Sequence, residues 1–406
     1  MTVTLTQIKQ ITGVTAFSNF SVVITNRAVV FNPTLPAFVF DYNTGSPGPI
    51  QAGLVIGSTQ QQLYTGASGG SNVTANEVPA IFFAGYILAG GGVCGYSGCM
   101  QNGPDSCGPW FISYNLQNNQ YTQNCSAEPS NSLTTQLLDV IIDYVNQYVY
   151  LYHSSSTQGA GVLFAVPFSA LSTFLANLQP PSSYKVAWIY PANNVPSGWN
   201  IYPGNVVYYN GTFYITGFDS NSNFYIWVVP YSSITWSTSF PSSTQSVGTV
   251  YSVYTGGGAG AGNIFLNYYV SSGTIVTEIL AYIPAGWNST NITYNNVYIY
   301  SFNPSNNTVT QLYSLSNANA FMRSINLGGI IIFVQKPSSG TYYVSAYDRK
   351  TNSFEQSSSL TNLLGLIVAE PYYAIAFSGS ASSMTITIYQ ILLDVVPAFV
   401  NVTYSN

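Results

Sequence analysis

Apolar and polar residues alternate along most of this chain in short runs that turn-forming residues separate. The segment VVYYNGTFYITGF (206–218) has an Asn-Gly pair between two alternating runs, which is a strong signal for a β-hairpin. Residues 140–152 and 324–334 follow the same plan. Successive side chains of a strand point to opposite faces, so this periodicity predicts strands with one face in a core. Helical periodicity is nearly absent, and SLTTQLLDV (132–140) is the segment in which we expect a single helical turn.

A ten-residue pattern occurs three times, as YNLQNNQYTQ (114–123), FNPSNNTVTQ (302–311) and YDRKTNSFEQ (347–356). Each copy begins with an aromatic residue followed by Asn or Asp, has Asn at its sixth position and ends in Gln. Because each follows a strand-like run and has turn formers in its middle, the pattern predicts a hairpin. A variant, VPFSALS (166–172) and VPYSSIT (229–235), also follows a strand, and its proline indicates a strand end or a sheet edge.

These hairpins belong to a four-stranded meander that recurs along the chain. Four-stranded units repeated around one axis are typical of a β-propeller. The sequence therefore predicts an all-β fold, a seven-bladed β-propeller forming a single domain over residues 1–406, with six or eight blades as alternatives. The blades are expected near residues 18–57, 78–126, 138–178, 203–240, 248–315, 322–360 and 364–400.

Two units depart from the regular plan. The fifth unit is long, and we expect an extra hairpin in EILAYIPAGWNSTNITYN (278–295). The last unit is one strand short, whereas TVTLTQI (2–8) at the N-terminus is an alternating strand with no blade of its own. Pairing these two segments would remove two open sheet edges, so we expect the ring to be closed by the N-terminal strand.

The segment YYVSAYDRKTNSFEQ (342–356) resembles the kelch-type propeller pattern, in which an aromatic-Asp turn leads to an outer strand. The di-glycine of that family has counterparts in Gly328-Gly329 and in Gly90–Gly92, whereas its tryptophan is mostly missing. The resemblance extends over most of the chain at the level of pattern, and it implies the propeller fold.

Composition narrows the function classes. Hydrophobic residues make up 47% of the chain and charged residues only 5%, with 34 tyrosines supplying much of the polarity. The net charge is −5, from 7 basic and 12 acidic residues without a basic patch, so nucleic acid is excluded as a partner. No apolar run reaches the length of a membrane helix, and we expect no membrane insertion. The N-terminus lacks the features of a signal peptide.

Cysteines and glycosylation sequons indicate an exposed setting. Cys94, Cys99, Cys107 and Cys125 lie close together in a Gly-rich excursion with no zinc-binding spacing, so we expect two disulfides, with three pairings open and four reduced thiols as the alternative. Possible glycosylation sites are Asn19, Asn72, Asn124, Asn210, Asn288, Asn291, Asn306 and Asn401. Localisation on a virion surface or outside the cell follows from both signals.

Motifs for catalysis are weak. Residues 66–70 have the spacing of a nucleophile elbow but lie in a Ser/Gly loop, and His153 is expected to be a polar residue at a strand end. Neither the glycine run 256–262 nor the Asp219–Asn223 segment completes a phosphate or calcium site. We therefore predict no catalytic residue, cofactor or metal.

Carboxylates and arginines were the remaining candidates. Asp139, Asp143, Glu370 and Asp394 form no visible pair, although residues from different blades could meet in space. The arginines are Arg27, Arg323 and Arg349, and because Arg349 belongs to an outer turn, no sialidase-type arginine cluster is expected.

The charge-poor composition resembles that of exposed structural proteins in viruses of hot-acid archaea. We therefore expect a non-enzymatic virion structural or surface protein from a thermophile. Its propeller would be a scaffold for host attachment or for contacts between virion proteins. Its partners would be other virion proteins or host-surface glycans and proteins, bound by the Trp287 insertion or the cysteine-rich excursion. The alternative is an extracellular carbohydrate-active enzyme or a cell-surface adhesin on a propeller scaffold, and carboxylates converging in the axial cleft would favour the enzyme.

Overall fold

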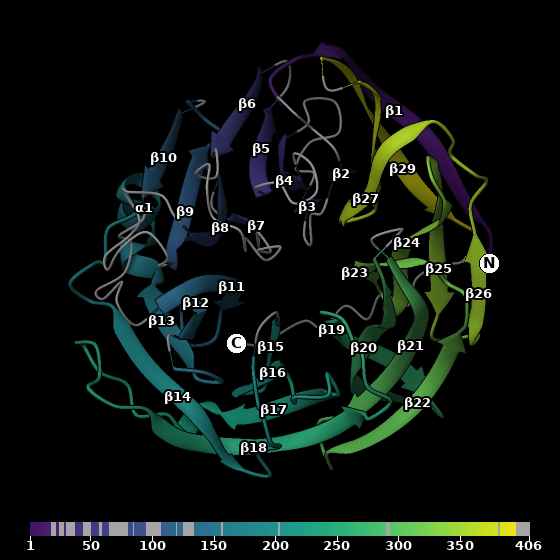
Figure 1. Ribbon diagram of the computed structural model, residues 1–406. Coiled ribbons are helices and arrows are strands. Elements are labelled where there is room, and N and C mark those ends of the chain that lie inside the picture. Colours follow the sequence, from purple (N-terminus) through teal and green to yellow (C-terminus); the bar gives the residue numbers. More distant parts are fainter. Residues whose placement is uncertain are drawn as a thin grey trace.

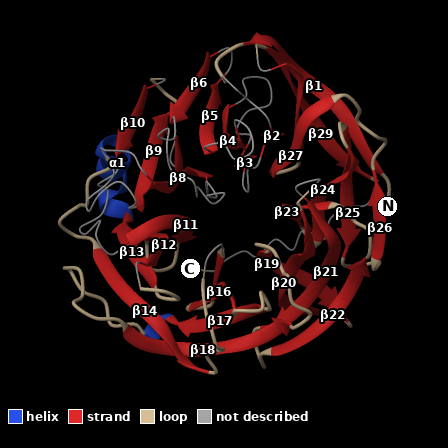
Figure 2. Cartoon of the chain, viewed as in Figure 1, coloured by secondary structure: helices blue, strands red, loops and turns tan. Residues whose placement is uncertain are grey.

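Antiparallel sheets stand around a common centre, and strands make up most of the described chain (Figures 1 and 2). The computed structural model describes residues 1–17, 22–23, 28–29, 37–43, 50–56, 59–64, 80–83, 85–94, 107–118, 120–124, 134–155, 157–201, 204–289, 293–380 and 382–394. The protein is an all-β propeller, so the predicted fold class is confirmed.

Two four-stranded sheets come first along the chain. One has the order β2-β4-β5-β6 and comprises β2 (Val22–Val23), β4 (Ala37–Asn43), β5 (Ile50–Ile56) and β6 (Thr59–Tyr64). The other has the order β10-β9-β8-β7 and comprises β7 (Ala80–Phe83), β8 (Tyr86–Cys94), β9 (Cys107–Asn115) and β10 (Gln120–Asn124).

The next sheet has eight strands and consists of two four-stranded meanders. The first meander contains β11 (Thr134–Asp143), β12 (Tyr148–Ser155), β13 (Gly161–Pro167) and β14 (Lys185–Asn193), with α1 (Phe168–Asn177) between the last two strands. The second contains β15 (Val206–Tyr209), β16 (Thr212–Phe218), β17 (Phe224–Pro230) and β18 (Gln245–Tyr254), with the short helix η1 (Tyr231–Ser233) after β17.

Another eight-stranded sheet follows, and a five-stranded sheet ends the chain. The eight-stranded sheet contains β19 (Asn263–Ser271), β20 (Thr274–Asn288), β21 (Thr293–Asn303), β22 (Thr308–Leu315), β23 (Ala320–Leu327), β24 (Ile330–Ser338), β25 (Thr341–Asp348) and β26 (Ser353–Gln356). The last sheet has the order β1-β29-β28-β27-β3, with β1 (Val3–Val14), β3 (Ala28–Val29), β27 (Leu363–Glu370), β28 (Tyr373–Ser380) and β29 (Ser383–Leu393). The blade number of seven stays a prediction.

The three decapeptides are equivalent hairpin turns. They join β9 to β10, β21 to β22 and β25 to β26, in each case the third and fourth strands of a meander. Asn307 and Asn352, at the sixth position of two copies, have φ of 58° and 53°, a left-handed conformation that asparagine tolerates better than most residues. The second residue of each copy accepts a backbone hydrogen bond across the turn, from Gln117 N to Asn115 Oδ1 (2.8 Å), from Ser305 N to Asn303 Oδ1 (2.9 Å) and from Lys350 N to Asp348 Oδ1 (2.9 Å).

The proline variants occupy the same place in their meanders as the decapeptides, at the end of the third strand. Pro167 and Pro230 end β13 and β17, and the next residues start α1 and η1. In four meanders, the residue after the third strand donates its backbone N–H to the turn between the first two strands. These bonds run from Leu116 to Gly85 (3.0 Å), from Phe168 to Gln147 (2.9 Å), from Tyr231 to Gly211 (2.7 Å) and from Arg349 to Gly329 (3.0 Å).

Several predicted boundaries need correction. Residues 132–140 contain no helical turn where the structure describes them, because 134–140 belong to β11. The third unit extends to Asn193, and β18, which was assigned to the fifth unit, pairs with β17 of the fourth. The sequence pattern did not identify β14 and β18 as the fourth strands of their meanders, because a long connection precedes each of them and no hairpin signal marks their start. β14 and β18 pair with each other in parallel, from Ile189 opposite Gln245 to Asn193 opposite Thr249.

The extra hairpin predicted in residues 278–295 of the fifth unit is absent where the structure describes this segment, because these residues belong to one long hairpin of β20 and β21. β20 and β21 pair continuously from Ile279 opposite Phe302 to Asn288 opposite Thr293. The apolar alternation of residues 278–295 therefore lengthens two strands of the meander and adds none.

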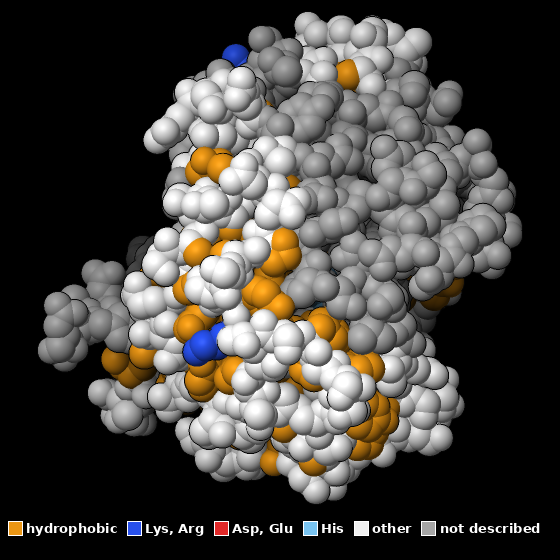
Figure 3. Space-filling model, turned by 90° about the vertical axis from the view of Figure 1, so that its left-hand side faces the viewer, with side chains coloured by type: hydrophobic (Ala, Val, Ile, Leu, Met, Phe, Trp, Pro, Cys, Tyr) orange, Lys and Arg blue, Asp and Glu red, His pale blue; other side chains and the backbone are white. Residues whose placement is uncertain are grey.

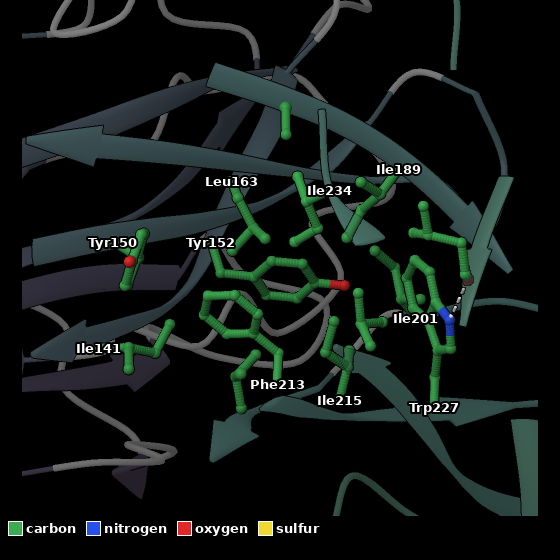
Figure 4. Packing of buried hydrophobic residues seen from close by; sticks show 14 of the residues in the cluster. Ile141, Tyr150, Tyr152, Leu163, Ile189, Ile201, Phe213, Ile215, Trp227 and Ile234 are labelled. Carbon is green, nitrogen blue, oxygen red and sulfur yellow. Dashed lines mark hydrogen bonds between the residues drawn. The ribbon is translucent and has the colours of Figure 1, made fainter. Parts of the chain in front are cut away.

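The hydrophobic core lies between neighbouring meanders. Tyr152 of β12 packs among Phe213 and Ile215 of β16 and Trp227 of β17 (Figure 4). The indole Nε1 of Trp227 donates a hydrogen bond to the carbonyl oxygen of Val247 (2.9 Å). Each meander thus buries its faces against its neighbours, and repetition stabilises the whole fold.

The N-terminal strand closes the ring as predicted. β1 pairs antiparallel with β29, from Val3 opposite Leu393 to Val14 opposite Met384, and supplies an outer strand of the last sheet (Figure 1). Asp394 adds a polar contact, because its carboxylate accepts hydrogen bonds from the backbone N–H and the hydroxyl of Thr2. These bonds lower the pKa of Asp394.

The backbone register narrows the disulfide pairing. Cys94 of β8 lies directly opposite Cys107 of β9, and opposed residues in antiparallel strands have Cα atoms about 4.5–5.5 Å apart, within the range of disulfides. Cys99 and Cys125 lie outside the described residues. We expect peptide mapping of the unreduced protein to find Cys94 linked to Cys107, closing a loop worth roughly 3 kcal/mol of stability. A linkage of either cysteine to Cys99 or Cys125 would contradict this pairing.

Candidate active site on the propeller axis

The first strand of each of five successive meanders lies nearest the centre of the ring. These inner strands are β11, β15, β19, β23 and β27, while β14, β18, β22, β26 and β1 lie on the outside (Figure 1). Propellers commonly form a channel or pocket where their inner strands meet. Polar residues on these inner strands are therefore candidates for a functional site.

An axial pocket of about 220 Å³ opens between the inner strands. Each of the five strands, or the residue just before it, contributes at least one polar side chain to the pocket wall, among them Asp139, Asn205, Asn263, Arg323 and Glu370. Two carboxylates and one guanidinium from three different meanders therefore share one small cavity.

Three of these residues also join neighbouring meanders. Inner strands of adjacent blades form no continuous ladder, so a buried backbone N–H at this position needs another acceptor. A side-chain oxygen of the preceding meander supplies it at three successive boundaries. The bonds run from Val206 N to Asp139 Oδ2 (2.8 Å), from Ile264 N to Asn205 Oδ1 (3.1 Å) and from Ser324 N to Asn263 Oδ1 (2.9 Å).

The charged residues of the axial pocket differ in burial. Asp139 is 1% exposed, and its second oxygen, Oδ1, accepts the N–H of Val140 (2.8 Å), so backbone donors hold both oxygens. Arg323 is 6% exposed and donates from Nη1 to the carbonyl oxygen of Gly262 (3.0 Å). Glu370 is half-buried at the end of β27. Backbone donors thus hold Asp139 in place, and Glu370 is the more exposed of the two carboxyl groups.

A larger cavity, the tyrosine cleft, borders the axial pocket. It has a volume of about 1190 Å³, and its wall includes Tyr144, Tyr208, Tyr209, Tyr231 and Tyr268. Leu266 of β19 lines both cavities, so the two are neighbours. Asn210, one of the possible glycosylation sites, is exposed in the β15–β16 turn at the wall of this cleft.

The structure separates the other candidate residues. Asp143 lies in the tyrosine cleft, and Asp394 lies at the ring closure. His153 was expected at a strand end, but it is fully buried within β12, between Leu137 of β11 and Val162 of β13. The apolar run before it continues as strand for two more residues, which the sequence pattern did not reveal.

Arg349 belongs to an outer turn as expected and has a structural partner there. Its Nε donates to both carboxylate oxygens of Glu278 (3.0 and 3.2 Å), and its guanidinium lies 4.8 Å from the ring centre of Tyr269. Arg27 lies outside the described residues. Only Arg323, among the arginines that the structure describes, lines the axial pocket.

The remaining predicted sites are scattered. Trp287 is 52% exposed at the end of β20, packs on Tyr294 and lines neither the axial pocket nor the tyrosine cleft. Of the possible glycosylation sites, Asn124, Asn210, Asn288 and Asn306 are described, and Asn19, Asn72, Asn291 and Asn401 lie outside the described residues, as does the cysteine-rich segment 95–106. Glycosylation stays a prediction.

The described part of the chain contains neither clustered metal ligands nor a helix that could span a membrane. No group of three or more His, Cys, Asp or Glu side chains lies together there in a way that could hold a metal ion. None of the helices described is long and apolar enough to cross a membrane. The side of the ring that carries α1 shows few charged groups among hydrophobic and uncharged polar side chains (Figure 3).

Comparison with known proteins relates the chain to others through its fold. No protein-family model matches it, and no curated protein is significantly similar in sequence. Among solved structures, an ulvan lyase of a polysaccharide lyase family, bound to a saccharide, matches 94% of this chain and 96% of its own with a TM-score of 0.53 at 10% identity. A Trypanosoma rangeli sialidase in complex with sialic acid matches 96% of this chain but 58% of its own, with a TM-score of 0.45 at 9% identity. Both have β-propeller folds.

These comparisons correct the functional prediction. The interpretation as a non-enzymatic virion protein for host attachment is contradicted by the ulvan lyase, a carbohydrate-active enzyme whose fold matches 94% of this chain with a TM-score of 0.53. The findings favour the alternative that was derived from the sequence, a carbohydrate-active enzyme on a propeller scaffold. They support neither the kelch-type resemblance nor a viral origin. The charge-poor composition misled because it is an average over the whole chain and does not show which residues meet at a site.

Proposed function

We propose that this protein is an extracellular carbohydrate-active enzyme that hydrolyses glycosidic bonds in a neutral polysaccharide at its axial pocket. The carrying observation is that Asp139 and Glu370, far apart in sequence, line the same pocket together with Arg323. Paired carboxylates are the chemical equipment of most glycosidases. The clustered cysteines and the sequons favour a location outside the cell, where polysaccharides are met.

The charges of the pocket favour cleavage of a glycosidic bond. When Glu370 has given its proton to the leaving oxygen, its carboxylate and that of Asp139 together outnumber the single guanidinium of Arg323, which stabilises the positively charged, oxocarbenium-like transition state. Asp139, held by the N–H groups of Val140 and Val206, is the fixed charge beside the developing cation.

Glu370 acts as the proton carrier in this scheme. Its carboxyl group gives a proton to the leaving glycosidic oxygen as the bond from that oxygen to the anomeric carbon breaks. A water molecule then adds its oxygen to the anomeric carbon and returns a proton to Glu370, so the enzyme ends as it began. Arg323, fixed by its bond to Gly262, donates hydrogen bonds to sugar hydroxyls.

A polysaccharide lyase is the second candidate, and Arg323 favours it. Lyases act on uronic acid units, and a buried arginine is suited to pair with the carboxylate of such a unit. The two reactions leave different products. Hydrolysis adds water and yields saturated sugars, whereas elimination yields a sugar with a carbon–carbon double bond that absorbs ultraviolet light.

The test compares three proteins on panels of neutral and uronic polysaccharides, with release of reducing ends and ultraviolet absorbance as readouts. We expect the unaltered protein to release saturated reducing ends from a neutral polysaccharide. Glu370→Gln should lower kcat by roughly 10²–10⁴-fold. Glu355→Gln, which alters an exposed glutamate of β26, is the matched control and should leave kcat unchanged.

Three results would overturn hydrolysis at this pocket. One is that no polysaccharide of either panel is cleaved, and another is that Glu370→Gln keeps the full rate. The third is an ultraviolet-absorbing product from a uronic polysaccharide, which would establish the lyase instead.

A further inference from the structure

The tyrosine cleft has a wall of a different kind from that of the axial pocket. Four segments form it: the β11–β12 turn, the end of β15 with its turn, η1 and β19. Five tyrosines contribute to this wall, with Asn146, Asn210 and Ser232 as further polar groups. Tyr144 is 67% exposed at its rim, where its ring packs edge-on against Phe168.

The wall of the cleft is held in place by Asp143. Oδ1 of this carboxylate accepts the N–H groups of Val145 and Asn146 (both 3.0 Å), while Oδ2 accepts Nδ2 of Asn146 (2.7 Å) and the hydroxyl of Tyr150 (3.1 Å). Nδ2 of Asn146 also donates to the hydroxyl of Tyr208 (3.1 Å), which ties the β11–β12 turn to the next meander. The network orders the cleft before any ligand arrives, which lowers the entropic cost of binding.

The charge of the cleft selects an uncharged ligand. No lysine or arginine belongs to its wall within the described residues, and its one carboxylate, that of Asp143, is occupied by the network. Burial, and then the charge of Asp143, raise the pKa of Tyr208, so its phenol stays protonated. Such a surface offers neutral hydrogen-bonding groups beside aromatic faces. A pyranose ring has the matching character, with a C–H face that packs on a ring and a rim of hydroxyls.

Size and proximity indicate a chain of sugars. The tyrosine cleft is several times larger than the axial pocket, and the shared wall residue Leu266 makes the two neighbours. A ligand that occupied both would be an oligomer with one unit at Glu370 and the others along the tyrosines.

We infer that the tyrosine cleft is a binding subsite for several consecutive units of a neutral polysaccharide, with the ring of Tyr144 as its outer stacking platform. The inference rests on the proposed function for the identity of the polymer, but binding to the cleft requires no catalysis. It also implies that Asn210 carries no glycan, because a glycan attached there would occupy the cleft.

Binding is measured by calorimetry in the Glu370→Gln background, so that no ligand is consumed. The probes are cellohexaose, xylohexaose, mannohexaose, hexagalacturonate and decaproline, the last because aromatic grooves also bind proline-rich peptides. We expect at least one neutral hexasaccharide to bind, and Tyr144→Ala to weaken it about tenfold or more. Tyr144→Phe, which keeps the ring, should retain the affinity.

Trp287→Ala is the matched control, because it removes an exposed aromatic side chain outside the cleft, and it should change nothing. The inference is overturned if hexagalacturonate or decaproline binds more tightly than every neutral hexasaccharide, if none of these binds, or if Tyr144→Ala has no effect. Neutral saccharide binding without any polysaccharide cleavage by the unaltered protein would sink the proposed hydrolysis and leave the subsite standing. Cleavage that depends on Glu370 without cleft binding would do the reverse.

Discussion

Removal of residues 1–14 is expected to lower the melting temperature of the protein by roughly 10 °C or more and to promote its aggregation. These residues include β1, which completes the last sheet by pairing with β29 along its length. Val3 and Val14 of this strand are 4% and 1% exposed, and burying a valine side chain contributes roughly 1.5–3 kcal/mol. The truncation also removes Thr2, the hydrogen-bond partner of Asp394.

Loss of β1 has a second cost because it opens the ring. β29 becomes an edge strand with unpaired N–H and C=O groups, which is a template for pairing with another molecule. The net stability of a folded protein is roughly 5–15 kcal/mol, so the lost contacts are a large part of it.

Calorimetry and light scattering of the truncated and complete proteins measure both effects. A synthetic peptide of residues 1–14, added to the truncated protein, should restore part of the lost melting temperature. Ile8→Ser is the matched control, because Ile8 is 36% exposed on the same strand, and we expect a change within about 0.5 kcal/mol. A truncated protein that melts like the complete one would show that the ring is held closed elsewhere.

The melting temperature is also expected to fall steeply as the pH rises from 10 to 12. Burial raises the pKa of Tyr342 and Tyr347 to about 12, and it raises the pKa of Tyr152 and Tyr282 well above 10. In the unfolded chain, tyrosines ionise near their ordinary pKa of about 10.

The direction of the effect follows from proton binding. Between pH 10 and pH 12 the unfolded chain has lost tyrosine protons that the folded protein still holds, so raising the pH favours unfolding. The contribution of these tyrosines is therefore intact below pH 10 and is lost as the pH rises through their folded values. Circular dichroism melting curves from neutral pH to pH 12 check this, together with tyrosinate absorbance, which should appear along with unfolding. Ionisation of the buried tyrosines near pH 10 in a protein that stays folded would contradict it.

Tyr152→Phe sharpens the alkaline test. The hydroxyl of Tyr152 is buried and has no hydrogen-bond partner among the residues described, so its removal relieves a cost of about 1–3 kcal/mol at neutral pH. The gain in stability should grow above pH 10, because one buried ionisable group has gone. Tyr144→Phe, which changes an exposed tyrosine, should leave the alkaline transition unchanged.

The sequence by itself determined the features that depend on neighbouring residues. Alternating apolar residues around Asn210-Gly211 specify a hairpin whatever surrounds them, and β15 and β16 pair as expected. The decapeptides carry their own turn chemistry in Asn303 and Asn307, so their place between third and fourth strands was predictable. Closure by β1 was predictable because the N-terminal strand had no blade of its own and the last blade lacked one strand. Local periodicity and the need to pair sheet edges were sufficient for the fold class and the closure of the ring.

Only the tertiary structure decided which residues share the axial pocket. Asn205, Asn263 and Arg323 each stand near the start of an alternating apolar run, and this recurrence was the one signal in the sequence that could have revealed them. Asp139, Arg323 and Glu370 lie on strands of three different meanders, and no spacing along the chain encodes their meeting. The curvature of the ring brings these inner strands together at the axis, and that curvature is set by how whole meanders pack on one another.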